Sequence, residues 1–459
     1  MRLTCLPAGR FVIRNMKVLK FGGTSVGSAE RMKALVSLIN NNEPKIVVLS
    51  AMSGTTNALV EIANALYARE NDKAKKLIDA LEKKYEGVLK GLFLSPPYKG
   101  GRGGFDKGKE LVKTHFEFIR SFTLDMFTTN EEKAILAQGE LLSTALEHFY
   151  LEEIGIDSIL LPALNFMRID ENDEPDLKYI EDNLKAELKK YSGKKLFITQ
   201  GYICRNAFGE IDNLKRGGSD YTATLIGAAL TSEEVQIWTD IDGMHNNDPR
   251  IVSKTFPVTE MSFDEAAELA YFGAKILHPT CVLPAQKRKV AVRLLNTMQP
   301  QAKGTVITEK ASSDRITAVA AKDGIIAIKI KSARMLLAYG FLRSVFEIFE
   351  RYKTPIDMIT TSEVAVSVTI DNDKNLDAIL KELKEFCTVE VDKDQTIVCI
   401  VGSFSAEKQG VAAKILESLK NIPLRMISYG GSENNVSVLI DSKHKKDALV
   451  ALNKGLFNL

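Results

Sequence analysis

Lysine, glycine and hydroxyl side chains gather at the end of a short apolar run near the start of the sequence, in Lys17-Val-Leu-Lys-Phe-Gly-Gly-Thr-Ser-Val-Gly27. A helix-compatible stretch follows at residues 29–35. Gly22 and Gly23 therefore place backbone N–H groups and a helix N-terminus where a phosphate can bind, and Lys20 adds a positive charge. The segment is not a Walker A loop, because the lysine precedes the glycines. Gly-Gly also occurs in ordinary strand-to-helix turns, so the other motifs must decide.

A second pair of glycines follows two basic residues in Lys215-Arg-Gly-Gly-Ser-Asp-Tyr-Thr-Ala-Thr-Leu-Ile-Gly227. The glycines bring backbone amides close to a ligand, and Arg216 can bind a carboxylate through two parallel hydrogen bonds. Asp220 lies near the start of the predicted helix, where it can orient Lys20, another donor or a metal ion. We interpret this segment as a second phosphate-type site with its own charged pair.

Polar residues follow another apolar run, in Trp238-Thr-Asp-Ile-Asp-Gly-Met-His-Asn-Asn-Asp-Pro-Arg250. Its Asp-Gly and Asp-Pro pairs indicate a tight loop directly after a strand. Arg250 in this loop and Lys275 further along suit a nucleotide. The five histidines show neither a metal-ligand spacing nor a catalytic-triad signature, and we interpret His278 before its proline as structural.

Two further positions could contact a substrate or serve the fold. Ser50 and Thr56 flank the end of an apolar run, where each can hydrogen-bond a small polar molecule or cap the next helix. Glu140 lies inside an apolar helical stretch, and a buried carboxylate needs a partner. A substrate ammonium group and an internal Arg or Lys would serve equally well.

Positive charge and backbone donors dominate these motifs, whereas candidate bases are few. Phosphoryl transfer needs that combination, because its catalysis consists mainly of positioning and charge stabilisation. A hydroxyl acceptor usually needs a nearby base, but a carboxylate acceptor is already ionised at pH 7. The motifs therefore favour a kinase that phosphorylates a carboxylate.

Strand-like apolar runs alternate with helical stretches up to about residue 300. The runs include residues 45–50, 158–161, 195–199 and 235–239. This alternation predicts an α/β fold, with a mainly parallel sheet sandwiched between helices. Because ligands of such folds bind at the carboxyl ends of the strands, we expect the motifs above to meet there.

One stretch interrupts this alternation. Residues 95–109 are dense in Gly, Pro and basic residues, which indicates an exposed loop or insertion. Within it Gly103, Gly108 and Lys109 match the spacing of a P-loop, but Glu110 replaces the required Ser or Thr and a preceding strand is missing. We therefore assign no phosphate to this stretch.

Composition limits the possible partners and the compartment. The 459 residues carry a net charge of +2 and are 45% hydrophobic, as expected for a soluble protein of two or three domains without a nucleic-acid or membrane partner. Five scattered cysteines without a Cys-x-x-Cys pair indicate a reducing compartment, the cytoplasm, rather than disulfides or zinc. Residues 1–15 are expected to form a loose extension before a natural start at Met16, with an ordered arm as the alternative.

A strand–helix–strand–strand pattern occurs twice beyond about residue 312. The copies comprise residues 325–330, 355–360 and 366–371, with a helix after Gly340, and residues 396–401, 423–428 and 436–441, with a helix after Gly410. Repeated βαββ units predict two copies of one small module. Their sheets can pair edge to edge and bind a small ligand at the seam, and duplication without a ligand is the alternative.

In combination, these motifs resemble those of the aspartate kinase family, in the same order and with similar spacing. They are Lys20–Gly27, Gly139–Leu141, Arg216–Asp220, Trp238–Asp240, Asp248–Arg250 and Phe272–Pro279. The paired C-terminal units resemble the family's tandem ACT modules, and the resemblance covers essentially everything after Met16 except residues 95–109. It implies a catalytic domain of amino-acid-kinase fold at 16–300, a linker and a strand joining the second ACT module at 301–321, and ferredoxin-like ACT modules at 322–391 and 392–459.

The resemblance implies ATP-dependent phosphorylation of the side-chain carboxylate of L-aspartate to 4-phospho-L-aspartate, the entry step toward lysine, threonine and methionine. Mg²⁺ would arrive with ATP, and a resident metal is not implied. Lys20 would stabilise the transferring phosphoryl group, and Asp220 would organise the site. The implied aspartate-binding residues are Ser50, Thr56, Glu140 for the ammonium group, Arg216 for a carboxylate, and Ser219. The implied ATP-binding residues are Lys20, Gly22, Gly23, Ser25, Thr239, Asp240, His245, Arg250 and Lys275.

The resemblance also implies feedback regulation of the lysine-sensitive type and a homodimer, or a dimer of dimers, through the ACT modules. The implied effector residues are Met335, Ala338, Phe341, Leu342, Asp357, Ser362 and Glu363. The sequence departs from the family pattern at His245, where a tyrosine is usual, and at 337–339, where Leu-Ala-Tyr replaces a more polar His-Ser-Arg stretch. Since the sequence ends at Leu459, without room for a fused homoserine dehydrogenase, we expect a monofunctional kinase.

Two alternatives remain beside this interpretation. Another carboxylate kinase of the same fold, such as one acting on acetylglutamate, would not need Glu140, because an acylated amine carries no charge. A catalytically inactive amino-acid sensor would use only the ACT pair, and the presence of both Lys20 and Asp220 argues against it.

Overall fold

The computed structural model describes residues 16–93, 103–124, 126–215, 217–273, 278–310, 315–331, 339–404 and 409–459. Several positions singled out in the sequence lie outside the described residues: 1–15, Arg216, Lys275, Met335 and Ala338. The chain divides into two compact units. The first comprises Met1–Gly243 and Thr280–Glu309, and the second comprises Met244–Pro279 and Lys310–Leu459.

The first unit is built on a mainly parallel sheet, as predicted. Its strands occur in the order β3-β4-β2-β1-β7-β9-β10. Their bounds are β1 Lys17–Phe21, β2 Lys45–Leu49, β3 Ile159–Leu161, β4 Leu196–Gln200, β7 Glu234–Thr239, β9 Ala291–Asn296 and β10 Thr305–Thr308. Of the neighbouring pairs, only β9 and β10 are antiparallel. The buried β-branched runs of the central strands explain the parallel arrangement, which requires cover on both faces.

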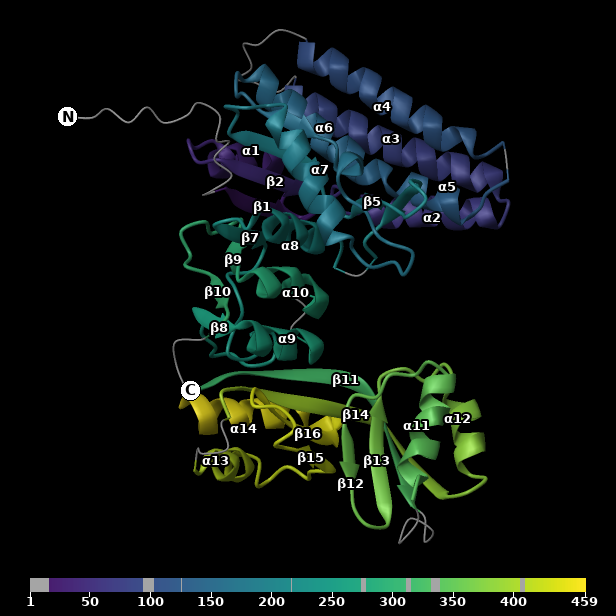
Figure 1. The fold of residues 1–459 in the computed structure, drawn as a ribbon, viewed down its shortest axis with the longest axis vertical. Helices are drawn as coiled ribbons and strands as arrows, with labels where there is room; N and C mark the ends of the chain where they lie inside the picture. Colours follow the sequence, from purple (N-terminus) through teal and green to yellow (C-terminus); the bar gives the residue numbers. More distant parts are fainter. Residues whose placement is uncertain are drawn as a thin grey trace, which may run out of the picture. The chain divides into compact units, whose positions relative to one another are not determined.

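Helices supply that cover (Figure 1). Their bounds are α1 Ala29–Ile39, α2 Thr55–Tyr67, α3 Asn71–Phe93, α4 Gly103–Ser121, α5 Thr129–Leu136, α6 Gln138–Glu153, α7 Leu177–Lys189, α8 Gly218–Leu230 and α10 Pro279–Arg288. Leu19 and Phe21 of β1 share a core with Val47 and Leu49 of β2 and with α1, α2, α3, α4 and α6. Helix α8 packs on β1, β2 and β7, and α7 packs on α8. A short hairpin, β5 Ile203–Arg205 and β6 Ile211–Asn213, follows β4.

The loop expected over residues 95–109 is wrong for its second half, because residues 103–109 begin α4. The glycines that indicated a loop instead allow two helices to approach closely. A Cβ added at Gly104 would lie 2.6 Å from Phe93 Cε1, and one added at Gly108 would lie 2.4 Å from Leu89 Cδ1. Both contacts are with α3, so glycine here serves packing rather than chain reversal.

The second unit contains a six-stranded sheet in the order β12-β13-β11-β14-β16-β15, with antiparallel pairing throughout. The helices and strands of the second unit, including β8, which is not part of this sheet, are β8 Glu260–Ser262, α9 Phe263–Tyr271, β11 Ile316–Lys331, α11 Phe341–Arg351, β12 Ile359–Thr361, β13 Ala365–Ile370, α12 Leu376–Leu383, β14 Thr388–Gly402, α13 Val411–Ser418, β15 Met426–Ser428, β16 Asn435–Asp441 and α14 Lys445–Phe457. The repeated βαββ pattern predicted from the sequence is therefore present.

The two repeats do not form separate sheets, because β11 and β14 are long enough to run through both. Residues 316–322 of β11 pair with 397–402 of β14, whereas residues 325–331 pair with 388–395. The first pairing lies in the core that includes α13 and α14, and the second lies in the core that includes α11 and α12. Each long strand thus contributes to two hydrophobic cores.

Residues 244–279 pack with the C-terminal repeats, although the surrounding sequence belongs to the first unit. Helix α9 packs on β11 and β14. The backbone N–H of Val319 on β11 donates to Asn246 O at 2.8 Å, and Thr317 Oγ1 donates to Glu265 Oε1 at 2.5 Å. This segment therefore belongs to the second unit in its contacts, and the chain on both sides of it belongs to the first unit or returns to it.

Candidate active site

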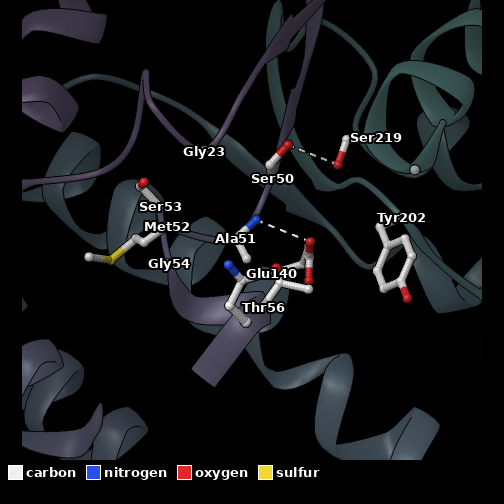
Figure 2. Close-up of a pocket in the computed structure, with 12 residues that line it drawn as sticks. Gly23, Ser50, Ala51, Met52, Ser53, Gly54, Thr56, Glu140, Tyr202 and Ser219 are labelled. Atoms are coloured by element: carbon white, nitrogen blue, oxygen red, sulfur yellow. Dashed lines mark hydrogen bonds between the residues drawn. The ribbon is translucent and has the colours of Figure 1, made fainter. Parts of the chain in front are cut away.

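A cavity of roughly 310 Å³ lies where the turns after β1 and β2 meet the N-terminus of α8 (Figure 2). It is lined by Gly23, Ser50, Ala51, Met52, Ser53, Gly54, Thr56, Asn57, Glu140, Tyr202, Gly218 and Ser219. Five residues that the sequence analysis assigned to aspartate or ATP are thereby brought together, from segments far apart in the chain. The cavity lies at the carboxyl ends of β1, β2 and β4, as predicted from the topology.

Lys20 and Asp220 form an ion pair beside this cavity. Lys20 Nζ lies 2.6 Å from Asp220 Oδ1, and the two side chains are 12% and 18% exposed. Neither residue lines the cavity, but Asp220 follows Ser219 in the first turn of α8. The Lys20 ammonium lies 3.4 Å from where a Cβ of Gly22 would stand. The carboxylate thus holds the lysine at the end of its strand, next to exposed backbone.

The Gly-Gly turn after β1 approaches the turn after β2 too closely for a side chain. A Cβ at Gly23 would lie 2.9 Å from Ala51 O and 3.4 Å from Ser53 N. Ser25, which was assigned to ATP, is 1% exposed, and its hydroxyl lies 2.8 Å from Thr297 Oγ1. In this structure Ser25 therefore joins two segments of the protein.

The second glycine pair begins α8 with an unusual backbone. Gly217 has a φ of 82° and Gly218 a φ of 44°, values in the left-handed region that favours glycine. This conformation directs the helix N-terminus at the cavity, where its N–H groups favour an anion. Ser50 Oγ donates to Ser219 Oγ at 2.9 Å, so the serine does not cap the next helix. Helix α2 has Gly54 as its N-cap, and Thr56 lies in its first turn.

Glu140 is the least satisfied polar group of the cavity. Its Oε1 accepts a hydrogen bond from the backbone N–H of Ala51 at 3.1 Å, and its Oε2 is buried without a partner among the described residues. Burial raises the pKa of this carboxyl to about 7, against the opposing effect of backbone hydrogen bonds. An internal Lys or Arg, one of the two expected partners, is not within ion-pair distance in the described part of the chain.

The residues assigned to the nucleotide are divided between the units. Thr239 ends β7 in the first unit and Asp240 follows it, and Thr239 Oγ1 donates to Asp240 Oδ1 at 3.1 Å. His245 and Arg250 belong to the second unit. Arg250 donates twice to Asp248, at 2.9 and 2.7 Å, and its side chain is 77% exposed.

The described effector residues all belong to the second unit. Phe341 and Leu342 begin α11, and Asp357 precedes β12. Ser362 closes the turn between β12 and β13 through a hydrogen bond from its N–H to Ala365 O at 2.8 Å, and Glu363 is exposed in that turn.

Sequence analysis missed several residues of the cavity, among them Tyr202. Figure 2 shows its ring beside Glu140. Its φ of 66° is uncommon for a residue other than glycine, and such strain often accompanies function. A usable signal was present, because Tyr202 follows Gly201 directly after the buried strand β4. The turn residues Ala51–Gly54 follow β2 in the same way.

Metal ligands and membrane spans were searched for in the described part of the chain. A group of three or more His, Cys, Asp or Glu side chains suited to a metal ion is not found there. Within the same residues, each helix is too short or too polar to cross a membrane.

Comparison with known proteins identifies the family. The amino acid kinase family matches residues 15–296, and an ACT domain matches residues 398–456. The lysine-sensitive aspartokinase 3 of Escherichia coli is 32% identical over 96% of this chain and 99% of its own length. This chain belongs to the aspartokinase family. Aspartokinase 1 of Arabidopsis thaliana chloroplasts is also 32% identical, over 96% of this chain and 80% of its own length.

Solved aspartokinase structures share the fold. Escherichia coli aspartokinase III in complex with aspartate and ADP, in the R-state, matches with a TM-score of 0.80 and 31% identity, over 96% of this chain and 100% of that chain. The same enzyme in complex with lysine and aspartate, in the T-state, matches with a TM-score of 0.79 and 31% identity, over 96% of this chain and 99% of that chain. Clostridium acetobutylicum aspartate kinase, at 22% identity and a TM-score of 0.82 over 96% of this chain and 100% of that chain, supports the fold alone.

The raised pKa of Glu140 predicts a pH-dependent stability in the absence of ligands. A carboxyl whose pKa rises from 4.5 to about 7 on folding stabilises the protein fully below pH 4.5 and loses that contribution as the pH rises toward 7. Between pH 5 and 8 we expect the free energy of unfolding of wild type to fall by about 2 to 3 kcal/mol through this residue, at about 1.4 kcal/mol per pH unit. Urea denaturation of Glu140→Gln should not show this decrease.

Glu147 provides a matched control on the same helix. It is fully buried, both of its oxygens lack partners among the described residues, and burial raises its pKa to about 8. Glu147→Gln should also reduce the loss of stability, over a window that extends to a higher pH. If Glu140→Gln lost as much stability as wild type between pH 5 and 8, the assigned protonation of Glu140 would be wrong.

Proposed function

We propose that this protein transfers the γ-phosphoryl group of ATP to the side-chain carboxylate of L-aspartate, giving ADP and 4-phospho-L-aspartate. This is the first step of lysine, threonine and methionine biosynthesis. One observation supports the acceptor above the others: the cavity contains a buried carboxylate, Glu140, with an oxygen that lacks a partner among the described residues. The free ammonium group of an amino acid supplies the missing charge and hydrogen bond. The relative crystallised with aspartate and ADP supports the same pair of substrates.

The reaction needs positioning more than acid–base chemistry. A side-chain carboxylate oxygen of aspartate attacks the γ-phosphorus, and the bond from this phosphorus to the β–γ bridging oxygen breaks, so that ADP leaves. The acceptor is ionised at neutral pH, and a general base is not required. Lys20 stabilises the charge on the transferring phosphoryl group, and Asp220 positions Lys20 through the 2.6 Å ion pair. The N-terminus of α8 and the Gly22–Gly23 turn add backbone donors.

The remaining assignments rest on the family resemblance and on the geometry. Ser50, Thr56 and Ser219 contact aspartate from the cavity wall, and Arg216 binds one of its carboxylates. Thr239, Asp240, His245, Arg250 and Lys275 bind ATP, which arrives with Mg²⁺. We assign the reaction to the cytoplasm, in agreement with the scattered cysteines of the chain.

Lysine is the effector that we propose for the ACT repeats. The supporting observation is the relative crystallised with lysine and aspartate, which aligns with 96% of this chain. Asp357, with a buried carboxylate, is the residue that we assign to an effector ammonium group.

The test of this function is aspartate-dependent ADP release with Mg-ATP, together with trapping of the acyl phosphate by hydroxylamine. L-Glutamate and N-acetylglutamate serve as rival acceptors. Of the three acceptors, we expect only L-aspartate to give hydroxamate. N-Acetylglutamate lacks the free amine that would bind Glu140, and L-glutamate has a longer side chain. Turnover with N-acetylglutamate would indicate another kinase of the fold. Folded protein that binds ATP without any turnover would favour the sensor.

Removing the Lys20 ammonium should slow the chemical step. We expect Lys20→Ala to lower kcat by about 10²-fold or more, on the scale of a lost charge stabiliser. Lys17→Ala is the matched control, because Lys17 lies on the same strand and pairs with Glu43 at 3.0 Å, at the end away from the cavity. Near-normal kcat in folded Lys20→Ala would contradict the assigned role.

We propose a homodimer, or a dimer of dimers, through the edges of the six-stranded sheet. Strands β12 and β15 are the terminal strands of its order. They also contact each other, and they expose Ile359 and Ile427, each 43% exposed. An edge strand with exposed apolar residues can pair with a second copy. We expect a dimer in sedimentation velocity at micromolar concentration, and dissociation in Ile359→Asp and Ile427→Asp. Val450→Asp is the control, because Val450 is an exposed residue of α14, and this variant should stay dimeric. A monomeric wild type would refute the proposal.

A further inference from the structure

The carboxylate of Asp357 already binds two side chains of its own chain. Its side chain is only 1% exposed, and its Oδ1 accepts hydrogen bonds from Tyr271 Oη at 2.7 Å and from Lys322 Nζ at 2.9 Å. Its Oδ2 is buried and lacks a partner among the described residues. The carboxylate therefore retains one free acceptor, although an internal ammonium group and a phenol already bind it.

The charges around Asp357 do not balance. Lys322 also pairs with Asp371 Oδ2 at 2.9 Å, and its ammonium lies 4.5 Å from the centre of the Tyr271 ring. Burial lowers the pKa of Lys322, but the hydrogen bonds and charges of both aspartates outweigh it, so the pKa is raised and the side chain stays charged. Two carboxylates thus share one ammonium. The remaining negative charge, next to a free oxygen, suits the ammonium group of an amino acid.

Tyr271 connects this cluster to the segment 244–279. It ends α9, and two residues later Gly273 presses against the strand that carries Lys322. Gly273 has a φ of 116°, and a Cβ there would lie 2.4 Å from Ala321 O. The C-terminal end of α9 is therefore held in two places: the backbone at Gly273 packs on β11, and the hydroxyl of Tyr271 donates to Asp357, just before β12.

Segment 244–279 lies inside the amino acid kinase match, at residues 15–296, yet it packs with the ACT strands. The chain re-enters the first unit at Gly243 and at Thr280. In the chain, the end of α9 thus precedes by a few residues the point at Thr280 where the first unit resumes.

We propose that Tyr271 is the positioning residue that couples an amino acid bound at Asp357 to the kinase reaction, and that Lys322 is an internal counter-ion with which the side-chain ammonium group of the effector competes. The proposal rests on the proposed function for its activity readout. An effector cation at Asp357 repels Lys322 and weakens the hold of Asp357 on Tyr271. The end of α9 then loses one of its two attachments.

The experiment uses full-length protein and L-lysine as the probe, with L-norleucine as an isostere that lacks the side-chain ammonium. Isothermal titration gives Kd, and hydroxamate formation gives the lysine concentration for half inhibition, relative to the uninhibited rate of each variant. The variants are Tyr271→Phe, Lys322→Met and Asp371→Asn. Tyr352→Phe is the control, because it removes the same kind of bond, from Tyr352 Oη to Glu382 Oε1 at 2.6 Å, between α11 and α12.

Tyr271→Phe should separate binding from inhibition. We expect its Kd for lysine to stay within threefold of wild type, while the concentration for half inhibition rises at least tenfold or inhibition disappears. Tyr352→Phe should match wild type in both. An unchanged inhibition curve in Tyr271→Phe overturns the coupling role, and so does an equal rise in both quantities, because Tyr271 would then be only a binding contact.

The two charge variants should shift Kd in opposite directions. Lys322→Met removes the competing cation and should lower Kd for lysine at least threefold. Asp371→Asn, a change at a side chain that is 41% exposed, removes the surplus negative charge and should raise Kd at least threefold. If Lys322→Met does not fold, Asp371→Asn alone decides the point. Unchanged Kd in Asp371→Asn, or a Kd that does not fall in folded Lys322→Met, overturns the counter-ion role.

The binding data also separate the two proposals. Lack of lysine binding by wild type, or equal binding of norleucine, overturns this inference and leaves the kinase assay unaffected. Lysine binding with the expected charge dependence but no aspartate phosphorylation overturns the proposed function, while the counter-ion role of Lys322 stands.

Discussion

The burial of the Glu140 carboxylate is the constraint around which the cavity is organised. Helix α6 presses so closely on the turn after β2 that a Cβ at Gly139 would lie 2.7 Å from Ala51 Cβ. That approach brings the Ala51 N–H to one carboxylate oxygen, while the other oxygen is buried without a partner among the described residues. A half-satisfied buried carboxyl is costly to ionise, so its pKa rises to about 7 and the neutral form is well populated near neutral pH. A ligand that brings a cation would restore the charged form, which is why we assign the ammonium group of the substrate to Glu140.

The Lys20–Asp220 ion pair also depends on close packing between backbone segments. Its two residues come from β1 and α8, which meet because Gly22, Gly23 and the left-handed Gly217–Gly218 turn keep side chains out of the junction. A partly buried pair contributes little net stability, because desolvation offsets much of the attraction. Its value is positional: the ammonium stays at the carboxyl end of the strand, beside backbone donors, where a phosphoryl group can meet it.

Local patterns predicted the parallel sheet, the βαββ repeat and the residues that meet in the cavity, because apolar runs and glycine pairs directly reflect strands and phosphate-binding turns. The loop expected at 95–109 failed at Gly104 and Gly108 because glycine also permits close helix packing, and only the neighbours Phe93 and Leu89 reveal which use applies. Tyr202 was missed because its strain arises from tertiary structure. The assignment of residues 244–279 to the second unit could not be predicted from local sequence either. It depends on partners that are distant in the sequence, such as Val319, which bonds Asn246 from more than 70 residues away.

That assignment places the loop of His245 and Arg250 in the same unit as the ACT repeats. The loop that carries His245 and Arg250 is held by buried amide hydrogen bonds to α14: Asn246 Nδ2 donates to Asn453 Oδ1 at 3.0 Å, and Asn247 Nδ2 donates to Leu449 O at 3.0 Å. Breaking such bonds leaves buried polar groups unpaired, at about 1 to 3 kcal/mol each. The loop is therefore anchored within the second unit. The positions of His245 and Arg250, which we assign to ATP, depend on its packing against α14, whereas Thr239, Asp240 and Lys20 belong to the first unit.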